Sequence, residues 1–179
     1  MRAGIYGVVC GVAALGLVGS LVAAWARQDA LAEEKSVRRA AFAYYSGLLL
    51  GDAEQCLGAS CPPLVSIRDG KMRVRDEKAL RALVSDVAKR TGAPQMDKDD
   101  RSRMATRMLQ VFDDADVRFL GASTATVVFV VRPRTTDASG DHLGELVLGK
   151  GDGKWRVVAE VTDSKPAPPL PDPTEPPPG

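Results

Sequence analysis

The sequence has few of the residues that metal sites and acid–base catalysis use. It contains one histidine, His142, and three cysteines among its 179 residues. Neither an HExxH pattern nor a paired CxxC spacing occurs, and the aspartates lack the spacing of a calcium-binding loop. We therefore expect no metal ion and no cofactor.

The sequence also lacks a large excess of charge of either sign. Its 24 lysines and arginines balance 23 aspartates and glutamates, and the formal net charge at pH 7 is +1. Such a balance exerts no overall attraction on a polyanion, so we expect no nucleic-acid partner. The length of the chain suits a single globular domain.

Charge is missing altogether from residues 3–26, a segment rich in valine, leucine and alanine. Because a helix rises about 1.5 Å per residue, roughly 20 apolar residues cross a bilayer, and this segment is long enough to do so. Arg2 precedes the segment and acidic residues follow it, which favours an exported domain. The segment therefore predicts a single-pass anchor in the cell membrane. Its Gly7 and Gly11 form a GxxxG pair, which is compatible with a homodimer.

A cleaved signal peptide is the alternative to an anchor. Residues 24–26 (AWA) and 30–32 (ALA) both match the small-x-small pattern of a cleavage site, and cleavage would yield a secreted or periplasmic protein. The length of the apolar segment favours the anchor, since the apolar part of a signal usually has only about 7–15 residues. We assign residues 1–32 to the anchor or signal, 33–163 to a folded domain and 164–179 to a tail.

Helical signals dominate the first half of the folded domain. Residues 33–51 carry apolar side chains at the i, i+3, i+4 spacing of an amphipathic helix. Further helices are expected to begin after aspartates, because an aspartate side chain can accept hydrogen bonds from the first-turn N–H groups. The expected N-caps are Asp52 for a short helix through Cys56, Asp76 for a helix ending at Gly92, and Asp97 for a helix to residue 113.

Strand signals dominate the second half. Asp69-Gly70, between the short apolar runs 64–67 and 72–74, predicts a hairpin. Four β-branched runs separated by short turns follow, at residues 116–120, 124–132, 142–149 and 154–162. The order of elements predicts an α+β fold in which a curved antiparallel sheet packs on amino-terminal helices.

The last of these runs alternates in polarity, with Val158 as a mild exception. Side chains of a strand point alternately to opposite faces of the sheet. We therefore expect one set to face the core and the other to face outward. The inward set is Trp155, Val157, Ala159 and Val161, and the outward set is Arg156, Glu160 and Thr162.

Proline dominates the carboxy-terminal end. Eight of the fourteen residues from Pro166 to Gly179 are proline. Such a composition favours an extended, solvated chain and cannot contribute to a packed core. The end of the protein is therefore predicted to be a tail or spacer.

The domain resembles the nuclear transport factor 2-like, or SnoaL-like, superfamily over roughly residues 35–163. The resemblance rests on the order of elements, on a long first helix ending in residues 48–52 (LLLGD), and on a final strand containing residues 154–158 (KWRVV). It implies a cone-shaped fold whose interior pocket serves isomerases, dehydratases and cyclases, and also many non-catalytic binding and assembly modules. Membrane-anchored members with an exported domain include bacterial secretion components and Mce-associated proteins. The helix over residues 97–113 departs from the minimal plan of the superfamily.

Tyr44 and Tyr45 are candidate pocket residues, because ketosteroid-isomerase-like members project a tyrosine from the first helix into the cone. No carboxylate matches the partner base of those enzymes, since the comparable region, residues 62–66, reads PPLVS. This departure argues against isomerase chemistry. His142, beside Asp141, is a third candidate, although a surface histidine near a turn would have the same sequence context.

Cys56 and Cys61 enclose a short loop that contains a glycine. Outside the cytosol such a loop can bring two sulfur atoms together, so we predict a structural disulfide between them. The spacing does not fit a CxxC-type redox site.

Two classes of function fit these features. The first is a non-catalytic envelope protein with a single-pass anchor and an exported interaction or ligand-binding domain, and it includes an unidentified protein partner. The second is a small isomerase- or dehydratase-like enzyme that uses the cone pocket, and it lacks a convincing acid–base pair. A secreted binding protein would follow from signal cleavage. The sequence leans towards a protein that is not an enzyme.

Overall fold

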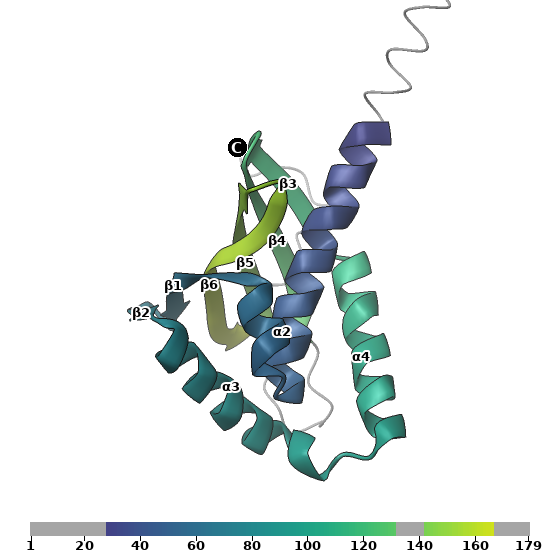
Figure 1. The fold of residues 1–179 in the computed structure, drawn as a ribbon, viewed down its shortest axis with the longest axis vertical. Helices are drawn as coiled ribbons and strands as arrows, with labels where there is room; N and C mark the ends of the chain where they lie inside the picture. The colour runs from purple at the N-terminus through teal and green to yellow at the C-terminus, as the bar shows by residue number, and fades with distance from the viewer. Residues whose placement is uncertain (1–27, 132–141, 167–179) are drawn as a thin grey trace, which may run out of the picture. The chain divides into compact units, whose positions relative to one another are not determined.

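The structure is a computed structural model that describes residues 28–131 and 142–166 of the chain (Figure 1). The chain divides into two compact units, residues 1–36 and 37–179. Of the first unit only residues 28–36 are described, and they are helical. The predicted apolar leader at residues 3–26 lies outside the described residues. Within the described ranges, no helix is long and apolar enough to cross a membrane.

The second unit begins with helical residues 37–50, which form its first helix. The helices that follow are α2 (Ala53–Gly58), α3 (Glu77–Thr91), the 3₁₀ turn η1 (Ala93–Gln95) and α4 (Lys98–Asp113). All three predicted N-caps are confirmed, since the side chains of Asp52, Asp76 and Asp97 each accept a hydrogen bond from a first-turn N–H. The left-handed Gly92, at φ 71°, ends α3 as expected.

Arg38 attaches the first helix to α4. Its guanidinium donates hydrogen bonds of 2.6 Å and 2.8 Å to the carbonyl oxygens of Phe112 and Asp113 at the last turn of α4. The carbonyl groups of a last turn have no partner within their own helix, and a cation there also interacts favourably with the helix dipole. The contact orients α4 beside the first helix, as Figure 1 shows.

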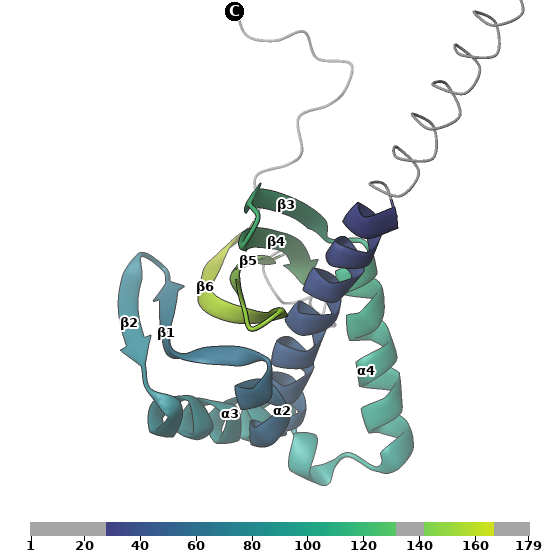
Figure 2. The same cartoon turned by 45° about the horizontal axis from the view of Figure 1, so that its top comes forward.

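Six strands form one sheet, in the spatial order β2-β1-β6-β5-β4-β3. Their bounds are β1 Ser60–Arg68, β2 Lys71–Arg75, β3 Asp116–Gly121, β4 Thr124–Val131, β5 His142–Gly151 and β6 Lys154–Pro166. Figure 2 shows how strongly these strands curve. The expected hairpin and the four later strands are present.

The prediction of an antiparallel sheet is wrong in one place, because β1 and β6 pair in parallel. The other neighbouring strands of the described sheet pair antiparallel. Short turns signal which consecutive strands pair, and consecutive strands so joined must be antiparallel. The β1–β6 pair joins segments at opposite ends of the domain, so no local signal in the sequence predicts its direction.

A β-bulge interrupts β6 at Val158. Leu148 of β5 pairs with Val157, whereas Val147 pairs with Ala159, so Val158 has no partner on β5. An extra residue of this kind reverses which side chains of the following stretch face inward. The predicted outward orientation of Glu160 is therefore wrong, because Glu160 is only 6% exposed.

Side chains of β6 alternate between the inner and outer faces of the sheet, and the bulge reverses this alternation. Before it, Trp155 and Val157 are buried in the core as predicted. After it, Ala159 and Val161 take the outer face and Thr162 takes the inner face, which reverses the prediction for all three. Core side chains of the helices and of the inner sheet face, among them Val37, Leu80, Phe112 and Leu148, pack into one apolar cluster.

Candidate functional site

The inner face of the sheet carries a buried carboxylate, that of Glu160. The Tyr44 hydroxyl donates a 2.7 Å hydrogen bond to Oε2 of Glu160, and the Ser66 hydroxyl donates a 2.7 Å hydrogen bond to Oε1. The register places Ser66 of β1 directly beside Glu160 of β6. The first helix supplies Tyr44. Three elements distant in sequence thus meet at one carboxylate.

Both tyrosines of the first helix are weaker acids than a free tyrosine. Burial raises the pKa of Tyr44 far above its usual range, and the charge and hydrogen bond of Glu160 raise it further. Burial, and then the charge of Glu160, raise the pKa of Tyr45 to about 12. Both hydroxyls therefore keep their protons at neutral pH, and that of Tyr44 donates to Glu160.

Glu160 also lines a cavity of about 170 Å³ between the first helix and strands β4, β5 and β6. The lining residues are Tyr45, Phe129, Val131, Leu143, Gly144, Glu145, Leu146, Glu160, Val161 and Thr162. The cavity is mostly apolar, with the Glu160 charge and the Tyr45 and Thr162 hydroxyl groups as its polar elements on the inner face. Small-molecule sites commonly combine an apolar lining with a few polar groups.

Aromatic rings form one wall of this cavity. Tyr45 contacts Phe129 edge-on, with ring centroids 5.1 Å apart, and it contacts Phe112 in the same way at 5.8 Å. Phe112 and Phe129 are 4.9 Å apart. Edge-to-face packing of this kind holds rings in defined positions, so the wall is rigid.

Gly144 makes room for that wall. It pairs with Phe129 across β4 and β5, and a Cβ added at Gly144 would lie only 2.5 Å from the ring of Phe129. Any other residue would push the ring out of its place above β5. The glycine therefore lets Phe129 lie over the neighbouring strand and line the cavity.

The charge of Glu160 has no ion-pair partner among the described residues. Arg75 and Arg68 are near enough to act on the tyrosines, since Arg75 lowers the pKa of Tyr44 and Arg68 lowers that of Tyr45, both as minor effects. Arg68 is exposed at the end of β1. Arg75 is half-buried, and its Nε atom is buried without a hydrogen-bond partner in the described part of the chain.

The structure brings together two of the three predicted pocket residues. Tyr45 lines the cavity, and Tyr44 does not, but its hydroxyl donates to Glu160, which does. His142 begins β5, but its side chain is outside the described residues. The sequence analysis missed Glu160 and Ser66. The only feature of the sequence that could have indicated a buried Glu160 is Val158, which breaks the alternation of apolar and polar residues in this strand.

The predicted disulfide is not formed in the structure. Cys56 and Cys61 are free thiols, the first buried on α2 and the second exposed on β1. Burial, followed by the charges of Glu160 and Asp52, raises the pKa of Cys56 to about 12. A neutral thiol in the core does not act as a nucleophile at pH 7.

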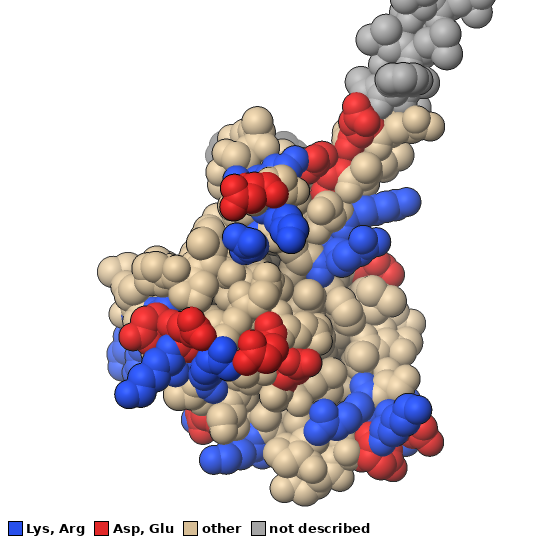
Figure 3. All heavy atoms as spheres, in the orientation of Figure 1, with Lys and Arg blue, Asp and Glu red and all other residues tan. Residues whose placement is uncertain are grey.

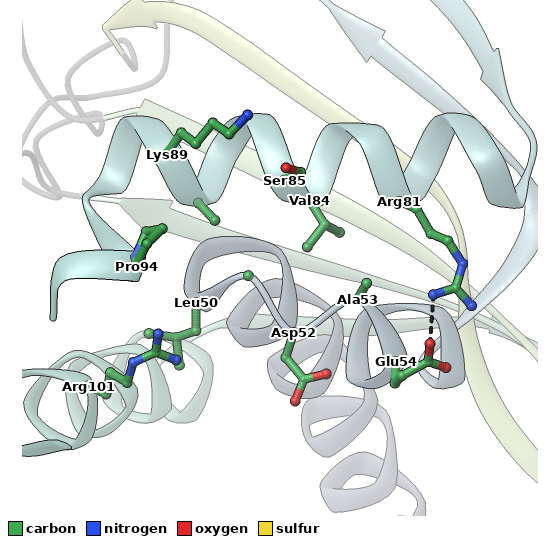
Figure 4. Close-up of a pocket in the computed structure, with 12 residues that line it drawn as sticks. Leu50, Asp52, Ala53, Glu54, Arg81, Val84, Ser85, Lys89, Pro94 and Arg101 are labelled. Carbon is green, nitrogen blue, oxygen red and sulfur yellow. Dashed lines mark hydrogen bonds and ion pairs between the residues drawn. The ribbon is translucent and has the colours of Figure 1, made fainter. Parts of the chain in front are cut away.

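A larger surface groove of about 570 Å³ runs between α2, α3 and the start of α4 (Figure 4). Its two arginines already have partners: Arg81 forms a 2.6 Å ion pair with Glu54, and Arg101 donates to the carbonyl of Ala93. The Arg81–Glu54 pair is exposed, and exposed pairs contribute little to stability or affinity. The groove is therefore less well supported as a binding site than the cavity beside Glu160.

No group of three or more metal-ligating side chains occurs in the described ranges. On the face shown in Figure 3, basic and acidic side chains are interspersed and do not gather by sign. An electropositive patch on that face is therefore missing, which agrees with the balanced composition.

Comparison with known proteins assigns the fold. No family model matches the sequence, and the comparison with curated proteins found no match. An NTF2-like protein with a cystatin-like fold from Novosphingobium aromaticivorans is 16% identical and has a TM-score of 0.50, over 80% of this chain and 88% of its own. A protein of unknown function from Mycobacterium tuberculosis is 16% identical with a TM-score of 0.50, over 75% of this chain and 73% of its own.

At these identities the likeness concerns the fold alone. The chain has the nuclear transport factor 2-like, cystatin-like α+β fold, with a mixed curved sheet and helices. The resemblance stated from the sequence is confirmed at this level. Function has to be argued from the site.

Proposed function

We propose that the domain is a non-catalytic module of the cell envelope that binds a small molecule in its interior cavity. The observation that carries the proposal is the cavity beside the buried carboxylate of Glu160. A buried carboxylate costs folding free energy, which a purely structural interior would avoid with an apolar residue. Such a group beside a cavity is typical of a binding site.

The hydrogen bonds that Tyr44 and Glu160 already form within the protein favour binding over catalysis. The proton of Tyr44 and one acceptor site of each Glu160 oxygen are used within the protein. Tyr45 lines the cavity and makes no hydrogen bond to another described residue, but its pKa of about 12 makes it a poor proton donor at neutral pH. An isomerase or dehydratase requires both a base and an acid that are available to the substrate.

The size of the cavity limits the ligand. A volume of about 170 Å³ is well below the roughly 300–1,000 Å³ of sites for drug-sized ligands. A steroid-sized or polyketide-sized substrate would not fit without rearrangement of the rigid aromatic wall. We therefore propose a ligand with a small number of non-hydrogen atoms.

The proposed location follows from the apolar segment at residues 3–26. A retained anchor would hold the domain at the outer side of the cell membrane, while cleavage would release it. Mass spectrometry of the amino terminus of the mature protein, together with membrane fractionation, distinguishes these outcomes. Recovery of the uncleaved chain in the cytosolic fraction would contradict the envelope assignment.

A cavity-blocking variant tests the binding proposal. A Thr162→Phe substitution adds a ring on the inner face of β6, whereas Val130→Phe adds the same ring at an exposed position of β4 that does not line the cavity. Fragments of up to about eight non-hydrogen atoms would be screened by chemical-shift changes of the Gly144 and Leu146 amides. We expect hits on the wild type and on V130F, and none on T162F. Hits that survive T162F would place the binding elsewhere and overturn the proposal.

A further inference from the structure

We infer that the ligand of this cavity is a small organic cation, with an ammonium group held by the carboxylate of Glu160. This inference rests on the proposed function and specifies the chemical class of the ligand. It follows from the charge of Glu160, from the spare acceptor capacity of its oxygens and from the aromatic wall.

The charge of Glu160 is the first argument. The side chain is buried, its two hydrogen-bond donors are neutral hydroxyl groups, and it forms no ion pair with any described residue. Two neutral donors solvate a carboxylate in part but leave its charge uncompensated. An ammonium group in the adjacent cavity would compensate the charge, through a hydrogen bond stronger than one between neutral groups.

The oxygens of Glu160 have the capacity for this bond. An ionised carboxylate offers about four acceptor sites, and Tyr44 and Ser66 occupy one on each oxygen. A ligand can therefore bind Glu160 without displacing either hydroxyl. The two hydroxyls also hold the carboxylate in place, so that little freedom is lost when the ligand binds.

The aromatic wall is the second independent feature. Tyr45 and Phe129 line the cavity with their ring planes inclined by 71° to each other. The face of an aromatic ring attracts a cation within about 6 Å, and more strongly in a desolvated site. The apolar residues Val131 and Leu146 complete a lining that suits the hydrocarbon part of a small alkylamine.

The same lining disfavours other ligand classes. None of the described residues that line the cavity is a lysine, an arginine or a histidine, so an anion would meet the Glu160 charge without compensation. A neutral ligand would fill the space but leave that charge unpaired. Two cations lie near the site. Arg68 is exposed to solvent, where its field is screened, and Arg75 is half-buried but neither lines the cavity nor forms an ion pair with Glu160.

A matched pair of probes tests the inference on the full-length protein. Isobutylamine is a cation at pH 7, and isobutanol is a neutral molecule of nearly the same shape. Titrations at constant ionic strength, followed by NMR of the amides lining the cavity, would give both affinities. We expect the amine to bind at least about tenfold more tightly, a difference of about 1.4 kcal/mol.

Two variants identify the group that is responsible. In Glu160→Gln the side chain keeps its shape and can still accept from Tyr44, so the preference for the amine should disappear while isobutanol still binds. Glu54→Gln removes an exposed carboxylate of α2 that does not line this cavity, and should leave the preference unchanged. Circular dichroism would verify that both variants fold.

The outcomes separate this inference from the proposed function. Equal affinity of the wild type for amine and alcohol, both lost in T162F, would overturn the cation inference and leave a binding cavity. Binding of neither probe, together with a fragment screen without cavity hits, would overturn both. A preference for the amine that persists in E160Q would show that Glu160 is not the recognition group.

Discussion

At the scale of single residues, Glu160 organises the site. It is held by Tyr44 from the first helix and by Ser66 from β1, and it lies beside a cavity that Tyr45 also lines. The two adjacent tyrosines therefore have different roles. Tyr44 supports the carboxylate, and Tyr45 contributes a ring and a hydroxyl group to the cavity wall.

Replacement of each tyrosine by phenylalanine separates these roles. Tyr44→Phe leaves one oxygen of a buried carboxylate without its donor, and hydrogen bonds to charged groups contribute about 1.5–3 kcal/mol. We expect a loss of about 2 kcal/mol in the free energy of unfolding, measured by urea denaturation. Tyr45→Phe removes a hydroxyl that makes no hydrogen bond to a described residue, so its effect should be below about 0.5 kcal/mol. Equal losses in the two variants would contradict this assignment.

The two cysteines of the domain should differ in reactivity. Cys61 is exposed, whereas Cys56 is buried with its pKa raised to about 12. Because the thiolate is the reactive form, iodoacetamide at pH 8 should label Cys61 in the folded protein and Cys56 only after unfolding. Peptide mapping by mass spectrometry distinguishes the sites. If neither is labelled until a reductant is added, the disulfide predicted from the sequence forms after all.

At the scale of elements, local chemistry sets where the helices begin, and the β6 bulge sets which side chains face the interior. The N-caps act within four residues of chain, so they are visible in the sequence. The bulge at Val158 depends on how β6 pairs with β5. It moves Glu160 to the inner face and so creates the polar centre of the site.

The cap of α4 allows a test with an internal control. In Asp97→Ala the N–H of Asp100 loses its acceptor, and loss of an N-cap costs about 1 kcal/mol. Asp113→Ala makes the same change at the carboxy-terminal end of the same helix, where a negative charge is unfavourable to the dipole. We expect Asp97→Ala to lower the midpoint of urea denaturation and Asp113→Ala to leave it unchanged or raise it slightly. A comparable loss in both would indicate a general effect of charge.

At the scale of the whole molecule, the parallel β1–β6 pair joins the amino-terminal hairpin to the strands of the carboxy-terminal half. This pairing makes one continuous sheet and brings Ser66 beside Glu160. The folded domain also buries the side chains of three weak acids in an interior of low dielectric constant. Tyr44, Tyr45 and Cys56 are all held in their neutral forms by burial.

These acids predict a loss of stability at alkaline pH. In the folded protein the pKa values of Cys56 and Tyr45 lie above their ordinary values of 9.0 and 10.0, and both reach about 12. The unfolded chain therefore releases protons first, so the free energy of unfolding is unaffected below about pH 9 and falls as the pH rises towards 12. Urea denaturation between pH 7 and 11 measures this, and Cys56→Ala should weaken the dependence that begins near pH 9. A curve that stays flat to pH 11 would contradict the burial of these groups.

The sequence by itself determined the helices, their caps, the hairpin at Asp69-Gly70 and the order of the strands. These features depend on interactions within a few residues of chain, which composition and periodicity report directly. The nuclear transport factor 2-like fold was implied by the resemblance that the order of these elements supports, and the same resemblance singled out Tyr44 and Tyr45 on the first helix.

Only the tertiary structure decided the direction of the β1–β6 pair, the position of Glu160 and the partners of the two tyrosines. Each depends on contacts between segments that are far apart in the chain. A bulge at one residue changes which face every later side chain of a strand occupies, and only pairing with the neighbouring strand reveals it. For this reason a glutamate whose sequence pattern indicated a solvated residue lies at the centre of the candidate site.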